Sequence, residues 1–466
     1  MRIRPVLLAS LLCLAGPARL NAQSAADRAL QRDLLRQLIE INTSDSAGRT
    51  REAAEAMARR LTDAGFPAAD VRVLEPVPGQ GMLVATYRGT GRAGKPILLL
   101  AHLDVVDARR EDWSFDPYAF LERDGYYYGR GTNDNKAGAA TLVANFIRYR
   151  AEGFRPDRDL VMVLTSDEET ESASIRYVLE RHRDLVDAEF ALNTDAGGGE
   201  LKDGKPVTFS VQAAEKVYLS FRLEARNPGG HSSVPVADNA IYGLTAALNR
   251  LAGFSFPIRL TEVSRAYFQQ SSEGQAAATA QDMRAVARNG DAAAAARLAR
   301  VPFYNAVLRT TCVATQLFAG HAENALPQLA RATVNCRIIP GQPADSVEAT
   351  LHRVLSDSAI RIARIRAPTP SPPSPLRPEV MRPIEALAAE FWPGAVVIPE
   401  MSTGATDGLY VRNAGIPVYG VSAIFDEIGD IRAHGRDERV GVEAYHRAAE
   451  YWYRLVKRLA AGGPGA

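Results

Sequence analysis

The sequence is poor in cysteine, and its charges show no excess of either sign. Only Cys13, Cys312 and Cys336 occur among 466 residues, which excludes a disulfide-rich scaffold and any cysteine-rich zinc module. Lys and Arg total 55 and Asp and Glu total 54, so the formal net charge is +1. Proteins that bind nucleic acids usually carry a strong basic excess, so no nucleic-acid partner is expected. The phosphate-binding glycine motifs of ATP and NAD enzymes are also missing.

Long hydrophobic runs are scarce as well. The apolar run 6–15 is shorter than the roughly 20 residues that a membrane span requires. It follows Arg2 and Arg4 and precedes small residues at 18–22, a pattern typical of a secretory signal peptide over residues 1–22. We therefore expect a periplasmic or secreted protein with no membrane association after signal removal. An N-terminal membrane anchor is the alternative interpretation.

Alternating strand and helix patterns fill most of the remaining chain. Its length suggests about two to three domains, and 46% hydrophobic residues are enough for a sizeable core. Strands are predicted at four short apolar runs, 96–101, 160–165, 190–193 and 416–421, with helical stretches between them such as 136–150. This pattern predicts an α/β fold with a mainly parallel sheet that helices cover. Further helices are expected within 27–64, with Thr50 as a cap, and over 442–459.

A second domain is predicted to be inserted into the first. Residues 215–366 read as mixed strands and helices, including an Ala-rich stretch at 275–300. Six prolines between residues 368 and 378 then indicate a linker. The predicted division is a signal peptide (1–22), a first catalytic part (23–214), an inserted lid or dimerisation domain (215–366) and a second catalytic part (367–466).

Side chains that can bind metals follow the predicted strands. The carboxyl ends of strands in an open α/β sheet meet in one crevice, so residues far apart in sequence can converge there. The segments are AHLDVVD, TSDEETES, NTDAGGG and RAHGRDER, with GRGTNDNKAG before a helix, and the candidate ligands are His102, Asp134, Glu169, Asp195 and His434. Each segment alone is also typical of a polar surface loop.

Together these side chains suggest a dinuclear metal site. Two His and three carboxylates suit zinc or a similar divalent ion, and five ligands exceed one tetrahedral shell. They suit two ions that share a bridging carboxylate. Asp104 could hold the imidazole of His102 through its carboxylate, and Glu168, adjacent to Glu169, could take a proton from the attacking water.

At these motifs the chain resembles the zinc exopeptidase family of glutamate carboxypeptidases, aminoacylases and succinyl-diaminopimelate desuccinylases. The resemblance implies that Asp134 bridges two zinc ions, which Co²⁺ or Mn²⁺ could replace. It assigns His102 and Asp195 to one ion, Glu169 and His434 to the other, and general-base and general-acid catalysis to Glu168. Asp104 would orient His102.

The resemblance extends to the inserted segment, which would be the lid and could form a homodimer. Its NPGGHSSVP motif implies that His231 stabilises the oxyanion, either in its own chain or in the other copy of a dimer. Asn324 in AENALPQ and Arg337 in NCRIIPG match positions that bind a substrate carboxylate. Gly404 in STGATDG matches a loop that lines the substrate site.

The extra Ala-rich segment and the motif order are similar to the carboxypeptidase S-like branch. We therefore expect a carboxypeptidase that cleaves the amide bond next to a C-terminal amino acid of a small peptide. Deacylation of N-acyl amino acids is the first alternative, and a zinc aminopeptidase or a non-catalytic binding homologue are others. Cys312 and Cys336 flank the loop of Asn324 and could form a disulfide in an oxidising compartment; the sequence leaves this open.

Overall fold

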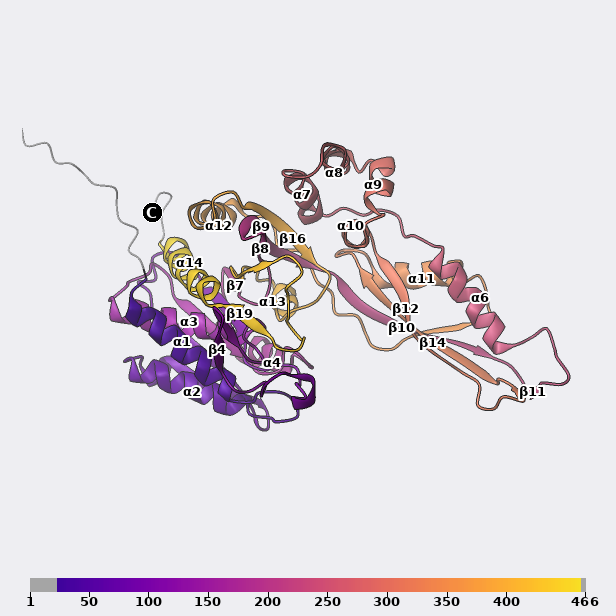
Figure 1. Ribbon diagram of the computed structural model, residues 1–466, viewed down its shortest axis with the longest axis horizontal. Helices are drawn as coiled ribbons and strands as arrows, with labels where there is room; N and C mark the ends of the chain where they lie inside the picture. The colour runs from indigo at the N-terminus through magenta and orange to yellow at the C-terminus, as the bar shows by residue number, and fades with distance from the viewer. Residues whose placement is uncertain (1–22, 462–466) are drawn as a thin grey trace, which may run out of the picture.

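The computed structural model describes residues 23–461 and consists of a rounded main body and an elongated lid (Figure 1). The predicted signal peptide, with Cys13, lies outside the described residues. Among residues 23–461, no helix is both long and apolar enough to cross a membrane.

A ten-stranded sheet forms the centre of the main body. Its four middle strands, β6, β3, β7 and β17, are parallel, which confirms the expected α/β fold with a mainly parallel centre. In spatial order the strands are β1 (Val71–Val77), β2 (Gln80–Tyr87), β6 (Leu160–Thr165), β3 (Ile97–His102), β7 (Phe190–Asn193), β17 (Val418–Gly420), β9 (Lys205–Glu215), β8 (Gly198–Lys202) and β18 (Phe425–Glu427), while β16 (Val396–Ser402) pairs with β9.

Helices cover both faces of this sheet, which explains why its middle strands are continuous apolar runs. All residues of β3, β6 and β7 are buried. One face packs against α1 (Ala25–Glu40), α2 (Thr50–Asp63), α3 (Lys136–Ala151), α12 (Pro378–Phe391) and α14 (Val442–Ala460). The other packs against α4 (Ala173–Arg181), α5 (Arg183–Val186) and α13 (Gly408–Asn413).

The expected cap at Thr50 is wrong by one residue. Thr50 is the first residue of α2 and Arg49 occupies the cap position, with no side-chain cap bond. The Thr50 hydroxyl is buried without a hydrogen-bond partner. A capping box is instead found at Ser24, where the Ser24 and Asp27 side chains bond each other's backbone N–H groups.

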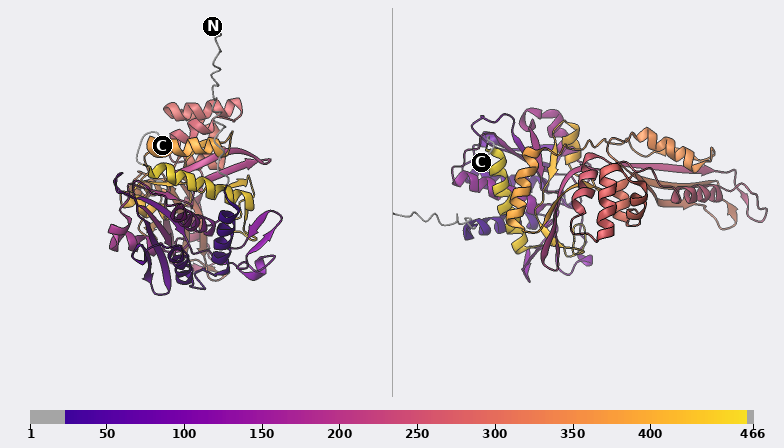
Figure 2. Two further views of the ribbon diagram at one scale, coloured as in Figure 1. Left: turned by 90° about the vertical axis from the view of Figure 1, so that its left-hand side faces the viewer. Right: turned by 90° about the horizontal axis from the view of Figure 1, so that it is seen from above.

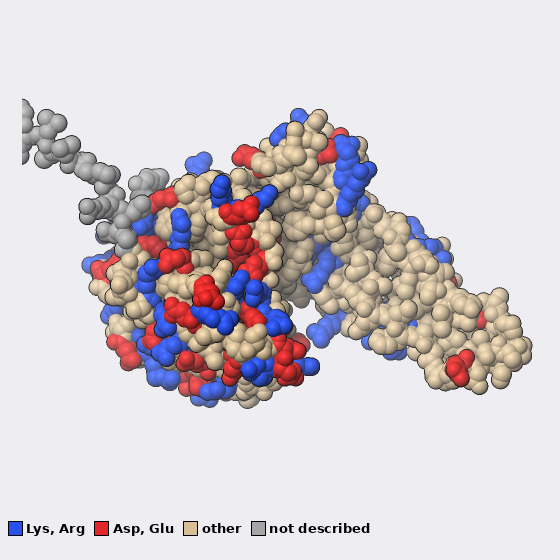
Figure 3. All heavy atoms as spheres, viewed as in Figure 1, with Lys and Arg blue, Asp and Glu red and all other residues tan. Residues whose placement is uncertain are grey.

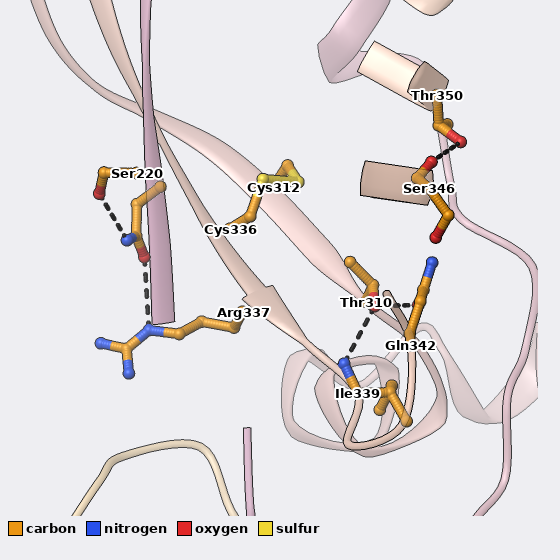
Figure 4. The surroundings of a disulfide bond; sticks show 10 residues. Ser220, Thr310, Cys312, Cys336, Arg337, Ile339, Gln342, Ser346 and Thr350 are labelled. Carbon is orange, nitrogen blue, oxygen red and sulfur yellow. Dashed lines mark hydrogen bonds between the residues drawn. A yellow bond between two sulfur atoms is a disulfide. The ribbon is translucent and has the colours of Figure 1, made fainter. Parts of the chain in front are cut away.

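The lid has a four-stranded antiparallel sheet and a hydrophobic core of its own. Helices α6 (Ala240–Ala252) and α11 (Ala344–Leu355) cover one face of its strands, which in spatial order are β12 (Thr311–Ala319), β14 (Leu329–Ile338), β10 (Val217–Arg226) and β15 (Arg361–Arg364). At the far end, β11 (Gly230–His231) pairs with β13 (Ala325–Leu326) to form the lid tip (Figure 1). Cys312 and Cys336 face each other across β12 and β14 and form a disulfide (Figure 4).

Four helices within the inserted segment pack on the main body rather than on the lid sheet. They are α7 (Glu262–Ser271), α8 (Ala277–Asn289), α9 (Ala292–Leu298) and α10 (Pro302–Leu308), and Figures 1 and 2 show them at the junction of the two bodies. Val263 and Phe268 of α7 belong to the core of the main body, and α7 lies against β16. The Ala-rich stretch thus differs from the expectation that it belongs to the lid.

A small three-stranded sheet of β4 (Leu121–Arg123), β5 (Tyr126–Tyr128) and β19 (Arg439–Gly441) lies beside the central sheet. It joins two loops that are more than 300 residues apart in sequence. Short 3₁₀ turns occur at Ala68–Asp70 and Arg110–Asp112. The proline-rich segment 368–377 has neither helix nor strand, and α12 begins at Pro378.

Candidate metal centre

The five predicted metal ligands converge at the carboxyl ends of the parallel strands. His102 is the last residue of β3, while Glu169 and Asp195 follow β6 and β7 within four residues. Asp134 precedes α3, and His434 lies in the loop before β19. Their ligand atoms form groups of three, each within 4.8 Å: His102, Asp134 and Asp195; Asp134, Glu169 and His434; and, with the neighbouring base candidate, His102, Glu168 and Glu169.

Asp134 is shared between two of these groups, one oxygen to each. His102 Nε2 lies 2.9 Å from Asp134 Oδ1 and 3.3 Å from Asp195 Oδ1. His434 Nε2 lies 3.1 Å from Asp134 Oδ2 and 2.9 Å from Glu169 Oε1. Each imidazole nitrogen therefore meets two carboxylate oxygens, and the Asp134 carboxylate connects the two clusters. This is the arrangement that a dinuclear site with one bridging carboxylate requires.

The electrostatics of the cluster fit divalent cations. Burial alone would lower the pKa of His102, but the surrounding carboxylates, led by Asp195, raise it well above its usual range. Hydrogen bonds to Asp134 and Glu169 raise the pKa of His434 to about 10. Burial raises the pKa of Asp195 to about 7. Buried carboxylates and imidazoles at this spacing form a donor set that suits zinc and similar ions.

Asp104 contacts its neighbours differently from the prediction. His102 Nδ1 is 3.0 Å from the backbone oxygen of Asp104 and 3.6 Å from its carboxylate. The Asp104 carboxylate accepts hydrogen bonds from the backbone N–H groups of Glu168 and Glu169, at 3.1 and 2.9 Å. Asp104 thus orients His102 chiefly through its carbonyl and fixes the paired-glutamate loop through its side chain.

Glu168 stands where the metal centre meets a larger cavity. It lines a pocket with Asp134, Glu169, Asp195 and His434, and also a cavity of about 890 Å³ between the main body and the lid. Burial, together with the nearby charge of Asp195, raises the pKa of Glu168 well above its usual range. A carboxyl group with a raised pKa accepts a proton more readily, as a general base must.

Of the three lid residues predicted to act on the substrate, His231, Asn324 and Arg337, only Arg337 lines this cavity. Arg337 follows Cys336 on β14, so the two side chains point to opposite faces of the lid sheet (Figure 4). Its Nη1 donates to the backbone oxygen of Thr403 at 3.0 Å, and its guanidinium lies over the Tyr218 ring. Gly404 is exposed beside that contact, while Ser402 and Ala405 on either side line the metal pocket.

His231 and Asn324 lie at the exposed lid tip, away from the metal ligands of the same chain (Figure 1). The backbone N–H of Ser232, next to His231, donates to the backbone oxygen of Asn324 at 3.1 Å. The Ser233 hydroxyl lies 2.7 Å from His231 Nδ1. The structure therefore brings these two residues to each other and not to the metal ligands.

Two buried acids near the centre were missed by the sequence analysis. Asp407 accepts a hydrogen bond from the Thr165 hydroxyl at 2.5 Å, and burial raises its pKa to about 8. Glu438 accepts hydrogen bonds from the loop that carries Asp134. Both lie inside the motifs STGATDG and RAHGRDER, but only their place in the fold separates them from ordinary acidic loop residues.

Comparison with known proteins agrees with this geometry. The sequence model of the peptidase family M20/M25/M40 matches residues 98–458. The chain is 28% identical over 385 residues to human N-fatty-acyl-amino acid synthase/hydrolase PM20D1, covering 80% of this chain and 76% of that protein. It is 26% identical over 388 residues to the probable carboxypeptidase S-like 2 of Dictyostelium discoideum, covering 80% and 74%.

A solved structure shares the fold. The M20 family metallo-carboxypeptidase Sso-CP2 of Sulfolobus solfataricus aligns with a TM-score of 0.67 at 17% identity, covering 92% of this chain and 99% of that one.

Proposed function

This chain belongs to peptidase family M20/M25/M40, and from that premise we propose that it is a dizinc carboxypeptidase for small peptides. It would cleave the amide bond next to a C-terminal amino acid that bears a free carboxylate. The observation that carries the proposal is the shared Asp134 carboxylate, whose two oxygens serve two ligand clusters beside Glu168.

The ligands for the two ions follow from the two clusters. His102, Asp134 and Asp195 would hold one zinc ion, and Asp134, Glu169 and His434 the other. Co²⁺ or Mn²⁺ would serve as substitutes, since the same donors bind them. When bound, the ions supply Lewis-acid activation of the scissile carbonyl and of the attacking water.

Glu168 and Arg337 would carry out the remaining steps. Glu168 lines both the metal pocket and the larger cavity, so it can take the proton from the water and pass it to the leaving amine. Arg337 lines the same large cavity, and a guanidinium is the preferred partner of a carboxylate. The substrate carboxylate would therefore bind at Arg337 with its amide directed toward Glu168.

Hydrolysis of N-acyl amino acids is the second candidate. The large cavity is lined in part by the apolar residues Ile365 and Leu409, which favour an apolar acyl group. The name of the human relative, an N-fatty-acyl-amino acid synthase/hydrolase, points the same way. Both activities need the same carboxylate contact and the same base.

A homodimer formed through the lid would explain why His231 and Asn324 are remote from the metal ligands. The distal lid surface shows few charged side chains in Figure 3, in contrast to the main body. Val313, Leu317 and Phe318 on β12 and Tyr242 on α6 are large apolar side chains that are more than half exposed. An exposed apolar patch of this kind favours a protein–protein contact, which could bring His231 of one copy to the oxyanion in the other.

We further propose export to the periplasm or the exterior after removal of residues 1–22. The Cys312–Cys336 disulfide supports this location, because disulfides persist in oxidising compartments.

The test is a panel of dipeptides, C-terminally amidated dipeptides and N-acyl amino acids, assayed with the zinc-loaded protein and after chelation. We expect hydrolysis of free-carboxylate substrates that chelation abolishes and zinc restores. Unchanged cleavage of amidated dipeptides would favour an aminopeptidase. Activity that survives chelation would contradict the metallohydrolase, and no activity on any substrate would favour a binding homologue.

A further inference from the structure

Glu438 is a buried carboxylate that four hydrogen-bond donors surround. Its side chain is fully buried. Oε1 accepts from the backbone N–H groups of Asn133 and Asp134, at 2.8 and 3.0 Å. Oε2 accepts from the backbone N–H of Gly131 at 3.0 Å and from Arg130 Nη1 at 2.6 Å. One side chain therefore holds the whole loop that ends in the bridging Asp134.

The small sheet places Glu438 against this loop. Strand β19 is antiparallel to β5, with Arg439 opposite Tyr128, and the Gly129 N–H extends the ladder by donating to the Glu438 carbonyl at 3.1 Å. The loop itself has little freedom at Gly131, which has a φ of +91°. A Cβ there would lie 2.8 Å from the Val105 side chain, so only glycine fits.

Arg130 extends the same contact to the loop of His434. Its Nη1 binds Glu438, and its Nη2 donates to the backbone oxygen of Gly435 at 3.0 Å. The guanidinium also lies over the Trp113 ring, with its carbon 5.1 Å from the ring centroid. The Arg130–Glu438 pair therefore connects the loop that ends in Asp134 with Gly435, the residue next to His434.

We propose that Glu438 is the positioning residue for the ion position formed by Asp134, Glu169 and His434. This inference rests on the proposed dinuclear site. His102 ends β3 and Asp195 follows β7, whereas the hydrogen bonds of the Glu438 side chain go to residues 130–134. Loss of Glu438 therefore weakens the His434 position more than the His102 position, although Asp134 serves both.

The variants are Glu438→Gln and, as a milder change that keeps the cation, Arg130→Lys. Glutamine keeps the size of the side chain but places an amide N–H₂ against two of the four donors. The matched control is Glu450→Gln, because Glu450 is also buried and also pairs with arginine, namely Arg148 and Arg454, but lies on α14. Each protein is dialysed against buffered free zinc, and bound zinc per chain is measured across the titration, with thermal unfolding recorded alongside.

Wild type and Glu450→Gln are expected to bind two zinc ions per chain. Glu438→Gln is expected to keep one ion near wild-type affinity and to bind the other about 10- to 100-fold more weakly. Arg130→Lys is expected to weaken the affinity for the same ion, but by less. If folded Glu438→Gln binds two ions at wild-type affinity, the inference about Glu438 is wrong, but the proposed function is not affected. If Glu438→Gln does not fold, the same result for folded Arg130→Lys decides the question. A wild type that binds two ions but hydrolyses no substrate would overturn only the proposed function. A wild type that binds fewer than two ions would overturn both.

Discussion

The main body and the lid position their functional side chains in different ways. In the main body, residues up to 300 positions apart meet within 4.8 Å, because the ends of the parallel strands and the loops before α3 and β19 meet at one edge of the sheet. In the lid, Arg337 lines the cavity, whereas His231 and Asn324 lie at the exposed tip. A single chain thus brings the metal ligands and the base together, but not His231 and Asn324, which are expected to contact the oxyanion and the substrate carboxylate. The following predictions test this difference.

The largest effect is expected in the main body, from Glu168→Gln. Removing the general base should lower kcat by about 10²- to 10⁴-fold, because glutamine cannot accept the proton from water. Zinc content should stay at the wild-type level, since other side chains hold both ions. The control is Glu171→Gln, an exposed acid on the same loop. Steady-state kinetics and metal analysis check this, and full activity in Glu168→Gln would exclude the proposed mechanism.

The lid tip should show its effect only through a second copy. His231→Ala should lower kcat by about 10²- to 10³-fold, as expected for loss of an oxyanion donor. Its control is His352→Ala, an exposed histidine on α11.

Mixing His231→Ala with Glu168→Gln makes the comparison sharper. Equal amounts should regain about a quarter of wild-type activity, because half of the dimers are mixed and each has one intact site. The readout is activity after the two variants are exchanged, together with the molecular mass in solution. A mixture that stays as inactive as its components would argue against a site shared between copies.

Arg337→Met should have a smaller and more selective effect. Charge-assisted hydrogen bonds contribute about 1.5–3 kcal/mol, so KM for free-carboxylate substrates should rise roughly 10- to 150-fold. Cleavage of amidated substrates, if measurable, should change little. Arg331→Met, six residues earlier on β14, provides the control. Equal losses for both substrate types would show that Arg337 does not bind the carboxylate.

The smallest effect concerns stability, at a buried histidine of the main body that is not a metal ligand. Burial lowers the pKa of His446 to about 4, and its ring nitrogens lie 2.7 Å from Gln31 Oε1 and 3.2 Å from the Tyr127 hydroxyl. In the unfolded chain the His446 ring takes up a proton near pH 6.5. The contribution of the neutral ring to the stability of the fold is therefore fully present above that pH and is lost as pH falls toward 4.

We expect His446→Gln to flatten the dependence of the unfolding temperature on pH between 6.5 and 4 by a few degrees. Thermal unfolding at a series of pH values checks this. An identical slope in both proteins would mean that His446 is not buried as a neutral ring.

The sequence was most informative where burial is strongest. The limits of β6 and β7 match the predicted runs, because strands buried on both faces leave a continuous apolar signature. The candidate ligands were recognisable because each follows such a strand or precedes a helix. Their joint position, rather than any single motif, carried the prediction.

Features that depend on tertiary contacts could not be predicted from the sequence. The Ala-rich helices pack on β16, although their sequence does not indicate which body they join. Whether Asp104 uses its carbonyl or its carboxylate toward His102 is decided by the turn after β3. Glu438 reads as one more acid in a charged loop until the pairing of β5 and β19 places it against residues 130–134.

Because helices α7–α10 pack on the main body, they raise the number of chain connections between the main body and the lid. Within residues 23–461, the chain passes between the main body and the lid four times, in the segments 215–217, 252–262, 308–311 and 364–378. A domain attached by two connections can swing about the line through them, whereas four separate connections leave few rotations open. Four connections therefore restrict rotation of the lid against the main body more than two would. A lid restricted in this way loses less conformational entropy when a substrate binds between it and the main body.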